Sequence, residues 1–147
     1  MPPVDRKKQQ RGFTLIELLV VLAILGLLAA FAVPRVLKYL SHARTEAAEI
    51  QISNLSSALD LYHLETGRYP TTEEGLIALY EAPPGIRGWN GPYLDKREGL
   101  IDPWGRPYRY RYPSEHGGAF DLYTLGADDA PGGEGENQDV TNWSQDN

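Results

Sequence analysis

The sequence predicts an α+β protein in which one long N-terminal helix packs on a small antiparallel β-sheet. Two observations lead to this prediction, and a third limits what can hold the fold together. A strongly apolar segment, residues 13–33, continues directly into a stretch with helical periodicity that runs to Gly67. Two short aromatic segments follow within residues 108–125, and a turn-forming sequence separates them. The chain contains no cysteine, so disulfides cannot hold this fold together.

The first residues predict a helix that spans a membrane with its start on the cytoplasmic side. Residues 1–12 contain four basic residues and one acidic residue, a net charge of +3, which leaves −9 on the rest of a chain whose total is −6. Residues 13–33 are apolar and long enough to cross a bilayer, which requires about 20 residues. Positive charges before a span keep that side in the cytoplasm, so the C-terminal part is expected on the other side.

Glu17 is the only charged residue within residues 13–33. A carboxylate at the centre of a membrane helix costs roughly 2.5–3.5 kcal/mol, and less toward the ends. Because a simple membrane anchor gains nothing from this charge, Glu17 is predicted to have a function. The alternative is an uncleaved signal anchor that carries Glu17 incidentally.

The same helix is predicted to continue beyond the membrane and to pack one apolar stripe on a globular head, because apolar side chains recur every three or four residues. The residues of this stripe are Ala48, Ile52, Leu55, Leu59 and Tyr62. Pro34 removes one backbone hydrogen bond and is predicted to bend or loosen the helix near the membrane boundary. Gly67 is predicted to end the helix. Thr71 or Thr72 is then predicted to cap a short second helix over residues 76–80.

Two strands are predicted over residues 108–112 and 120–125, with a loop at 114–118 that could join them in a hairpin. In the first strand tyrosine alternates with arginine, so the two residue types should lie on opposite faces of the sheet. Interleaved basic and aromatic residues can also indicate contact with nucleic acid. Because the chain beyond residue 12 carries −9, repulsion from phosphate favours the strand, with its arginines available to acidic neighbours.

The acidic loop near the C terminus is a candidate calcium site. Five acidic residues lie within twelve positions and alternate with three glycines. The acidic residues are Asp128, Asp129, Glu134, Glu136 and Asp139. Calcium takes six to eight oxygen ligands, including backbone carbonyls, and glycines let the backbone turn its carbonyls inward. The spacing is not that of an EF-hand, so composition alone leaves a solvated acidic loop as the simpler interpretation.

The junction Arg11-Gly12-Phe13-Thr14-Leu15-Ile16-Glu17 resembles the processing signal of type IV pilins and pseudopilins. In that family a prepilin peptidase cuts after the glycine, and the new N-terminal residue is methylated. The resemblance therefore implies cleavage between Gly12 and Phe13 and N-methylation of Phe13. It also implies that Glu17 of one subunit neutralises the Phe13 amine of a neighbour in a fibre. Within one chain, the same two groups are spaced for an i,i+4 interaction.

Several further segments, in the same order, resemble the major pseudopilins of the type II secretion system, the general secretion pathway protein G family. They are residues 66–71, 102–105, 120–121, 125–128 and 132–137. The resemblance implies a pilin-like fold whose C-terminal loop holds calcium through side-chain oxygens of Asp128 and Asp139 and the backbone carbonyl of Leu125. Gln138 stands where some relatives have a second aspartate, so the remaining ligands stay open.

The resemblance implies a leader at residues 1–12, a membrane and polymerisation helix at 13–35, and a periplasmic head at 36–147. The expected function is that of a structural subunit without catalysis of its own. It would polymerise through its N-terminal helix into a periplasmic pseudopilus that drives export of folded proteins across the outer membrane. Expected partners are further copies of the chain, minor pseudopilins, the prepilin peptidase, the inner-membrane assembly platform and the inner membrane, and no nucleic acid.

Two alternatives remain at this stage. A type IV pilus or DNA-uptake subunit is the first, but surface-fibre pilins usually close a C-terminal loop with a disulfide, which this chain cannot form. A membrane-anchored periplasmic enzyme or binding protein is the second. His42, His63 and His116 show neither metal-ligand nor catalytic-triad spacing, which argues against an enzyme.

Overall fold

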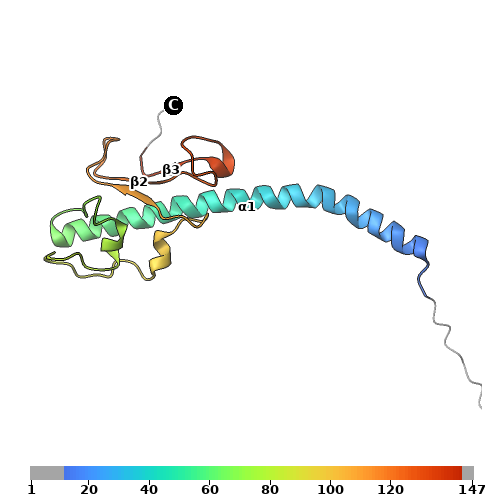
Figure 1. Ribbon diagram of the computed structural model, residues 1–147, viewed down its shortest axis with the longest axis horizontal. Coiled ribbons are helices and arrows are strands. Elements are labelled where there is room, and N and C mark those ends of the chain that lie inside the picture. The colour runs from blue at the N-terminus through green and yellow to red at the C-terminus, as the bar shows by residue number, and fades with distance from the viewer. Residues whose placement is uncertain (1–11, 144–147) are drawn as a thin grey trace, which may run out of the picture. The chain divides into compact units, whose positions relative to one another are not determined.

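The computed structural model describes residues 12–143 of the 147-residue chain (Figure 1). The elements follow one another as α1 (Leu15–Thr66), the 3-10 helices η1 (Leu76–Leu79) and η2 (Arg97–Leu100), the strands β1 (Arg109–Arg111) and β2 (Asp121–Thr124), the 3-10 helix η3 (Gly135–Asn137), and β3 (Val140–Thr141). The chain divides into two compact units, with the boundary between Lys38 and Tyr39. Each unit is described by itself below. The leader up to Arg11 lies outside the described residues.

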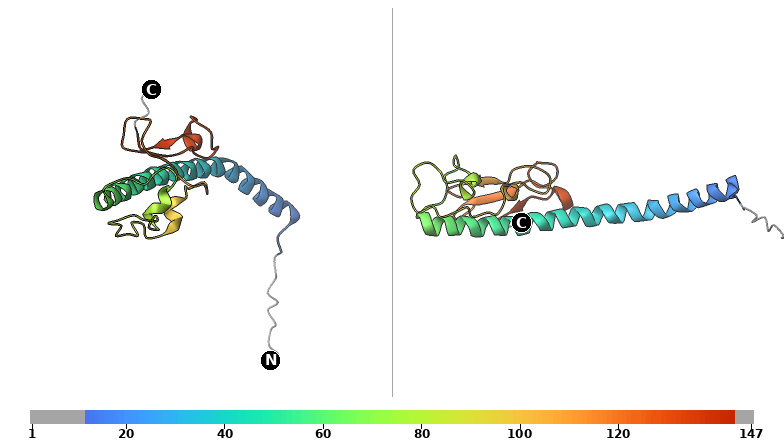
Figure 2. Two further views of the ribbon diagram at one scale, coloured as in Figure 1. Left: turned by 60° about the vertical axis from the view of Figure 1, so that its left-hand side comes forward. Right: turned by 90° about the horizontal axis from the view of Figure 1, so that it is seen from below.

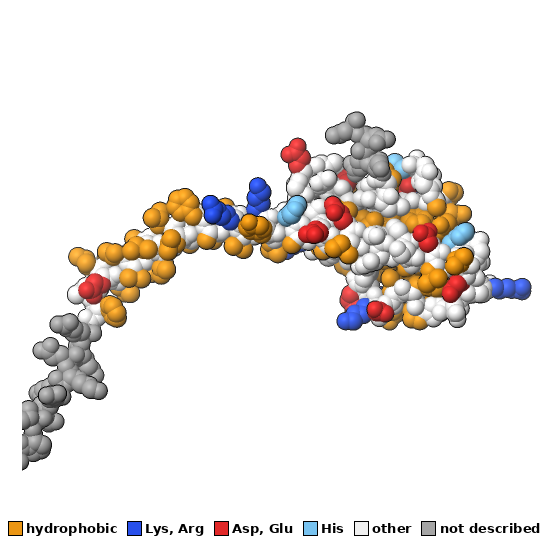
Figure 3. All heavy atoms as spheres, turned by 180° about the vertical axis from the view of Figure 1, so that it is seen from behind, with side chains coloured by type: hydrophobic (Ala, Val, Ile, Leu, Met, Phe, Trp, Pro, Cys, Tyr) orange, Lys and Arg blue, Asp and Glu red, His pale blue; other side chains and the backbone are white. Residues whose placement is uncertain are grey.

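The first unit is an exposed apolar helix. Every large apolar side chain from Phe13 to Leu37 is exposed, and orange side chains cover the visible face of this part of the helix in Figure 3. By length and composition this segment can cross a membrane, in agreement with the prediction for residues 13–33. Pro34 lies inside α1, which continues past it as helix. The bend predicted at Pro34 stays a prediction.

The second unit is organised around one buried face of α1. The five residues of the predicted stripe are each no more than 4% exposed, so the prediction from periodicity is confirmed. They pack with side chains from η1, from the sheet and from the segments beside it. These partners are Leu76, Ala78, Leu79, Tyr108, Phe120, Leu122 and Val140. Figure 2 shows the strands beside this part of the helix.

The sheet has three antiparallel strands in the order β1-β2-β3. Tyr110 of β1 lies opposite Leu122 of β2, and Val140 of β3 lies opposite Thr124. The predicted alternation holds, since the tyrosines of residues 108–112 are buried or half-buried and both arginines are exposed. The strand β3 was not predicted. It returns the acidic C-terminal segment to the sheet, with Val140 buried in the core.

The predicted second helix is a single 3-10 turn, η1. Thr71 Oγ1 accepts the N–H of Glu74 (3.2 Å), and Glu74 accepts the N–H of Thr71 (2.9 Å), but these bonds close the turn before η1. The N-cap of η1 is Gly75, with a φ of 62° and no side-chain bond, so the prediction that Thr71 or Thr72 caps this helix is wrong. Arg68 binds Glu74 with two hydrogen bonds of 2.6 and 2.7 Å, and these bonds lower the pKa of Glu74. Thr72 contributes no cap because its hydroxyl bonds to the Tyr112 backbone.

Substitutions at Leu55 and Leu64 should distinguish the buried face of α1 from its exposed face by their effect on stability. Leu55 is fully buried, so Leu55→Ala is expected to lower the free energy of unfolding of the head by about 2–5 kcal/mol. Leu64 lies on the same helix and is 79% exposed, so Leu64→Ala should change that energy by less than about 0.5 kcal/mol. Denaturant unfolding of the detergent-solubilised chain, followed by tryptophan fluorescence, measures both. Equal effects of the two substitutions would contradict the assignment of the face.

Candidate functional site

Glu17 lies in the first turn of α1 and closes a capping box with Thr14. Thr14 Oγ1 accepts the N–H of Glu17 (3.2 Å), and Glu17 Oε2 accepts the N–H of Thr14 (3.0 Å). Each side chain thus satisfies a backbone donor that the helix leaves free, and the carboxylate lies where the helix dipole favours negative charge. The sequence reasoning missed this role. Its signal is the Thr-x-x-Glu spacing immediately before an apolar run.

Phe13 precedes this cap, and its side chain is 90% exposed. In the described chain the nitrogen of Phe13 is a peptide nitrogen joined to Gly12. The predicted pair between Glu17 and a free Phe13 amine belongs to the cleaved chain, so it stays a prediction, as do cleavage and methylation.

The C-terminal loop connects β2 to β3, and its two arms touch directly. Ala127 donates its N–H to the carbonyl of Glu136 at 2.8 Å. At Gly126 the φ is 68°, and a Cβ built there would lie 2.8 Å from backbone atoms of residues 136–138. Glycine is therefore required at position 126 both by backbone conformation and by space.

The three residues predicted to hold calcium lie in this loop or at its start. Leu125 is buried directly after β2. Asp128 Oδ1 accepts the N–H of Ala130 (3.1 Å), and Asp139 Oδ2 accepts the N–H of Gly132 (2.9 Å). The described residues include no cluster of three or more acidic or histidine side chains that could hold a metal. A cation in this loop would therefore depend on backbone carbonyls as well as carboxylates.

The second oxygen of Asp139 fits a cation. Asp139 Oδ1 is buried and has no hydrogen-bond partner among the described residues. A buried polar atom without a partner loses its hydration without compensation, at a cost of about 1–3 kcal/mol and more when it is charged. A cation beside Asp139 would supply the missing interaction.

Two other acidic residues of the loop are already paired with arginines. Glu136 binds Arg44 of α1 (2.7 Å) and the indole N–H of Trp104 (3.1 Å), and these bonds lower its pKa. Asp129 binds Arg109 of β1 at 2.9 Å. On the same strand Arg111 pairs with Glu115. The expectation that the strand arginines contact acidic neighbours is therefore met within the chain.

Ser114, His116 and Asp121 meet in the hairpin, but not in the order of a catalytic triad. Asp121 is buried and accepts both the Ser114 hydroxyl (2.5 Å) and the His116 ring (2.9 Å). Burial alone would raise the pKa of Asp121, but these bonds and the N–H of Glu115 outweigh it and hold the pKa below its ordinary value. The His116 ring also stacks on Trp143, with ring centroids 4.0 Å apart. Because serine and histidine both bind the carboxylate, the group fastens the hairpin.

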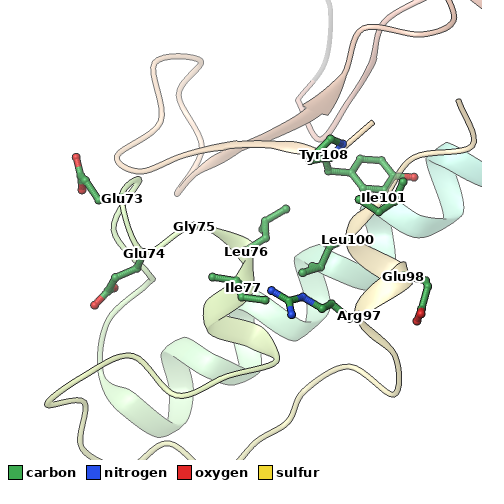
Figure 4. Close-up of a pocket in the computed structure, with 11 residues that line it drawn as sticks. Glu73, Glu74, Gly75, Leu76, Ile77, Arg97, Glu98, Leu100, Ile101 and Tyr108 are labelled. Atoms are coloured by element: carbon green, nitrogen blue, oxygen red, sulfur yellow. The ribbon is translucent and has the colours of Figure 1, made fainter. Parts of the chain in front are cut away.

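A groove of about 670 Å³ opens between η1, η2 and residues 107–108 (Figure 4). Its apolar lining includes Leu76, Ile77 and Leu100, and charged side chains such as Glu98 lie at its edge. No serine, cysteine or histidine lines it. The groove is thus a largely apolar surface feature, and its charged lining residues are Glu73, Glu74, Arg97 and Glu98.

Fold and sites together define a class of protein. The class has three features: a helix whose large apolar side chains are exposed as far as Leu37, a glutamate at the start of that helix, and a small antiparallel sheet closed by an acidic loop. These are the features of a pilin-like subunit. Two family models agree with this class. Type II secretion system (T2SS), protein G, matches residues 35–143, and the prokaryotic N-terminal methylation motif matches residues 7–33. The chain belongs to the type II secretion system protein G family.

Individual relatives agree with this membership. The type II secretion system core protein G of Pseudomonas aeruginosa is 44% identical over 94% of this chain and 98% of its own length. That of Vibrio cholerae is 42% identical over 96% and 97%. The crystal structure of the major pseudopilin from the type 2 secretion system of enterohaemorrhagic Escherichia coli matches with a TM-score of 0.57 and 33% identity, over 69% of this chain and 87% of that chain. The predicted fold and the resemblance to major pseudopilins are confirmed.

Gly126→Ala should destabilise the C-terminal loop more than Gly132→Ala does. Both glycines have a φ in the left-handed region, but a Cβ at Gly132 would meet nothing within 4 Å. Strain in φ alone costs about 1 kcal/mol, whereas the contact at Gly126 forces the two arms apart as well. Thermal unfolding of both variants measures the difference. A melting temperature for Gly126→Ala no lower than that of Gly132→Ala would show that the arms do not approach this closely.

Proposed function

We propose that this chain is the major subunit of a type II secretion pseudopilus and polymerises through the first part of α1. The observation that carries the proposal is the match to the N-terminal methylation motif over residues 7–33, which includes the start of α1, where the large apolar side chains are exposed. Such a helix requires either lipid or other apolar helices around it, because burial of apolar surface contributes about 25 cal/mol per Å². A membrane supplies lipid to the single subunit, and copies of the same helix supply the alternative in a fibre.

Glu17 distinguishes this subunit from a plain anchor. Its carboxylate is stabilised at the helix start by the N–H of Thr14 within the uncleaved chain. Cleavage after Gly12 would create a cationic amine at Phe13, four residues before Glu17. A neighbour's amine could then pair with the carboxylate in the apolar interior of a fibre, where opposite charges interact more strongly than in water. The pair would set the axial position of one subunit against the next.

The cellular arrangement follows from this role. The basic leader stays in the cytoplasm, a prepilin peptidase at the inner membrane removes it, and the head lies in the periplasm. The inner-membrane assembly platform adds subunits to the growing fibre, minor pseudopilins join it, and its extension drives folded proteins through the outer membrane. Family membership and the match to a pseudopilin structure support this proposal, and nothing in the comparisons favours a type IV pilus or DNA-uptake subunit.

The C-terminal loop is proposed to hold calcium. The supporting observation is the buried Oδ1 of Asp139, which has no hydrogen-bond partner in the described part of the chain and lies in the same loop as Asp128. A cation bound there would hold oxygen atoms from different parts of the loop together. It would thus fasten the loop, as a disulfide does in other pilins. Leu125 would contribute its carbonyl, and Asp128 and Asp139 their carboxylates.

Glu17→Val should give protein that is inserted and cleaved but does not assemble into fibres. The substitution makes insertion easier and removes the proposed partner of the Phe13 amine. Electron microscopy of fibres from overproducing cells, with the mass of the membrane-extracted subunit, measures both effects. Loss of residues 1–12 and gain of one methyl group would show that processing is intact.

Thr14→Val is the matched control because it removes the capping hydroxyl and leaves the carboxylate. It should still form fibres if the essential partner of Glu17 is on another subunit. Normal fibres from Glu17→Val, or equal loss of fibres in both variants, would refute the intersubunit role.

Calcium should raise the melting temperature of the head by several degrees relative to EDTA. A ligand that binds only the folded form at a hundredfold excess over its Kd stabilises it by about 2.7 kcal/mol, and about 1 kcal/mol shifts the melting temperature by several degrees in small domains. Asp128→Ala or Asp139→Ala should remove the shift, while Asp95→Ala, an exposed carboxylate outside the loop, should keep it. Magnesium should substitute poorly because it demands a tighter octahedral site. Identical melting curves in calcium and EDTA would leave the loop as a solvated acidic segment.

A further inference from the structure

Two arginines hold the first arm of the C-terminal loop, residues 126–129. Arg106 donates from one guanidinium nitrogen to the carbonyl of Gly126 and to that of Ala127 (3.0 Å). Its Nε lies 3.5 Å from Asp129 Oδ1, the same oxygen that Arg109 binds at 2.9 Å. The carboxylate of Asp129 thus lies between the two guanidinium groups.

Arg106 is itself held by a buried turn. Asp102 is 5% exposed, and its Oδ1 accepts the N–H groups of Trp104 (3.0 Å) and Arg106 (2.9 Å). Its Oδ2 accepts the hydroxyl of Thr124 at 2.5 Å. Because Thr124 ends β2, this carboxylate ties the backbone of Arg106 to the point where the loop begins.

Asp129 has a backbone conformation that few residues adopt. Its φ is 54°, and among the described residues it is the one non-glycine residue with a positive φ. Aspartate and asparagine tolerate this region better than most side chains. The turn at Asp129 separates its carboxylate, which faces the arginines, from that of Asp128, which bonds to Ala130.

We propose that Arg106, Arg109 and Asp129 form a clamp that shapes the first arm of the loop without metal and positions Leu125 and Asp128 for the cation. This inference rests on the proposed calcium site. The inference also assigns the oxygen atoms of the arm either to the clamp or to the cation. The carbonyls of Gly126 and Ala127 and the carboxylate of Asp129 serve the clamp, which leaves the Leu125 carbonyl and Asp128 for the cation.

The clamp reduces the cost of ordering the loop when the cation binds. A single ion pair at this exposure contributes about 0–1 kcal/mol, so the pairs with Asp129 do not carry the clamp alone. The two carbonyl bonds add charge-assisted contacts that fix the backbone itself. Groups that orient metal ligands in this way typically change metal affinity by about 10–100-fold when they are removed.

Calcium titration of the full-length chain in detergent tests the clamp. Arg106→Gln should weaken calcium binding at least about tenfold. Arg111→Gln is the matched control, since it removes the same charge from a nearby position, in a pair with Glu115 outside the loop, and its Kd should stay at the value of the unmodified chain. Asp129→Asn keeps a residue that tolerates the positive φ while weakening both arginine contacts, so it should also weaken binding.

Hydrogen exchange in EDTA provides a readout that needs no calcium. The amide of Ala127, which donates to the Glu136 carbonyl, should be protected in the unmodified chain and should lose that protection in Arg106→Gln. A Kd for Arg106→Gln and Asp129→Asn equal to that of the unmodified chain would overturn the positioning role. If Arg106→Gln does not fold, Asp129→Asn and Arg106→Lys decide the question, since lysine cannot bind both carbonyls and Asp129 with one planar group. If the unmodified chain binds no calcium, the calcium site fails, and unchanged exchange in EDTA would separately refute the clamp.

Discussion

The contact between the buried stripe of α1 and the small sheet supports every other feature of the head. The sheet contributes few buried side chains, because β1 and β2 are three and four residues long and β3 has two. The helix supplies much of the rest, including Leu55, Leu59 and Tyr62, each fully buried, and η1 supplies a further part. A core of this size leaves the long connections without enough apolar contact of their own, so they are fastened by polar groups. The Arg68–Glu74 pair, the Asp121 cluster and the contacts of the C-terminal loop are three such fastenings.

The C-terminal loop shows this dependence most clearly. No cysteine is present, and the buried apolar residue that follows the loop is Val140 of β3. Between β2 and β3 the chain is fixed by Arg44 on Glu136, by the Ala127–Glu136 backbone bond and by Arg106 on two carbonyls. These contacts leave Asp139 with one satisfied and one unsatisfied oxygen. The loop is therefore largely shaped by protein groups. The interaction still missing, at Oδ1 of Asp139, is one that a cation would supply.

Those parts of the fold that follow from sequence periodicity could be predicted. The apolar span, the stripe on α1 and the alternation of tyrosine with arginine are local patterns, and each appears in the structure as the pattern predicts. The strand β3 could not be predicted, because two residues carry no period and their pairing depends on β2. The same holds for the contacts of Arg106, which reach residues 20 and 21 positions away. The Thr14–Glu17 cap is also a local motif, but a lone carboxylate in an apolar span predicts a membrane or assembly role rather than a cap.

In the proposed fibre Glu17 would act both as a cap and as an assembly residue, because its carboxylate lies at the end of the helix where cleavage creates the Phe13 amine. In the uncleaved chain its carboxylate accepts the N–H of Thr14, one residue after Phe13. Cleavage would create a free amine at Phe13 of each subunit, and in the proposed fibre a neighbour's amine would approach this carboxylate. An exchange from a neutral donor to a cationic one strengthens the hydrogen bond, roughly doubling it in typical cases. The cost of a carboxylate in an apolar environment would thus be lowest after processing and within the proposed fibre, and cleavage of the leader would then favour assembly.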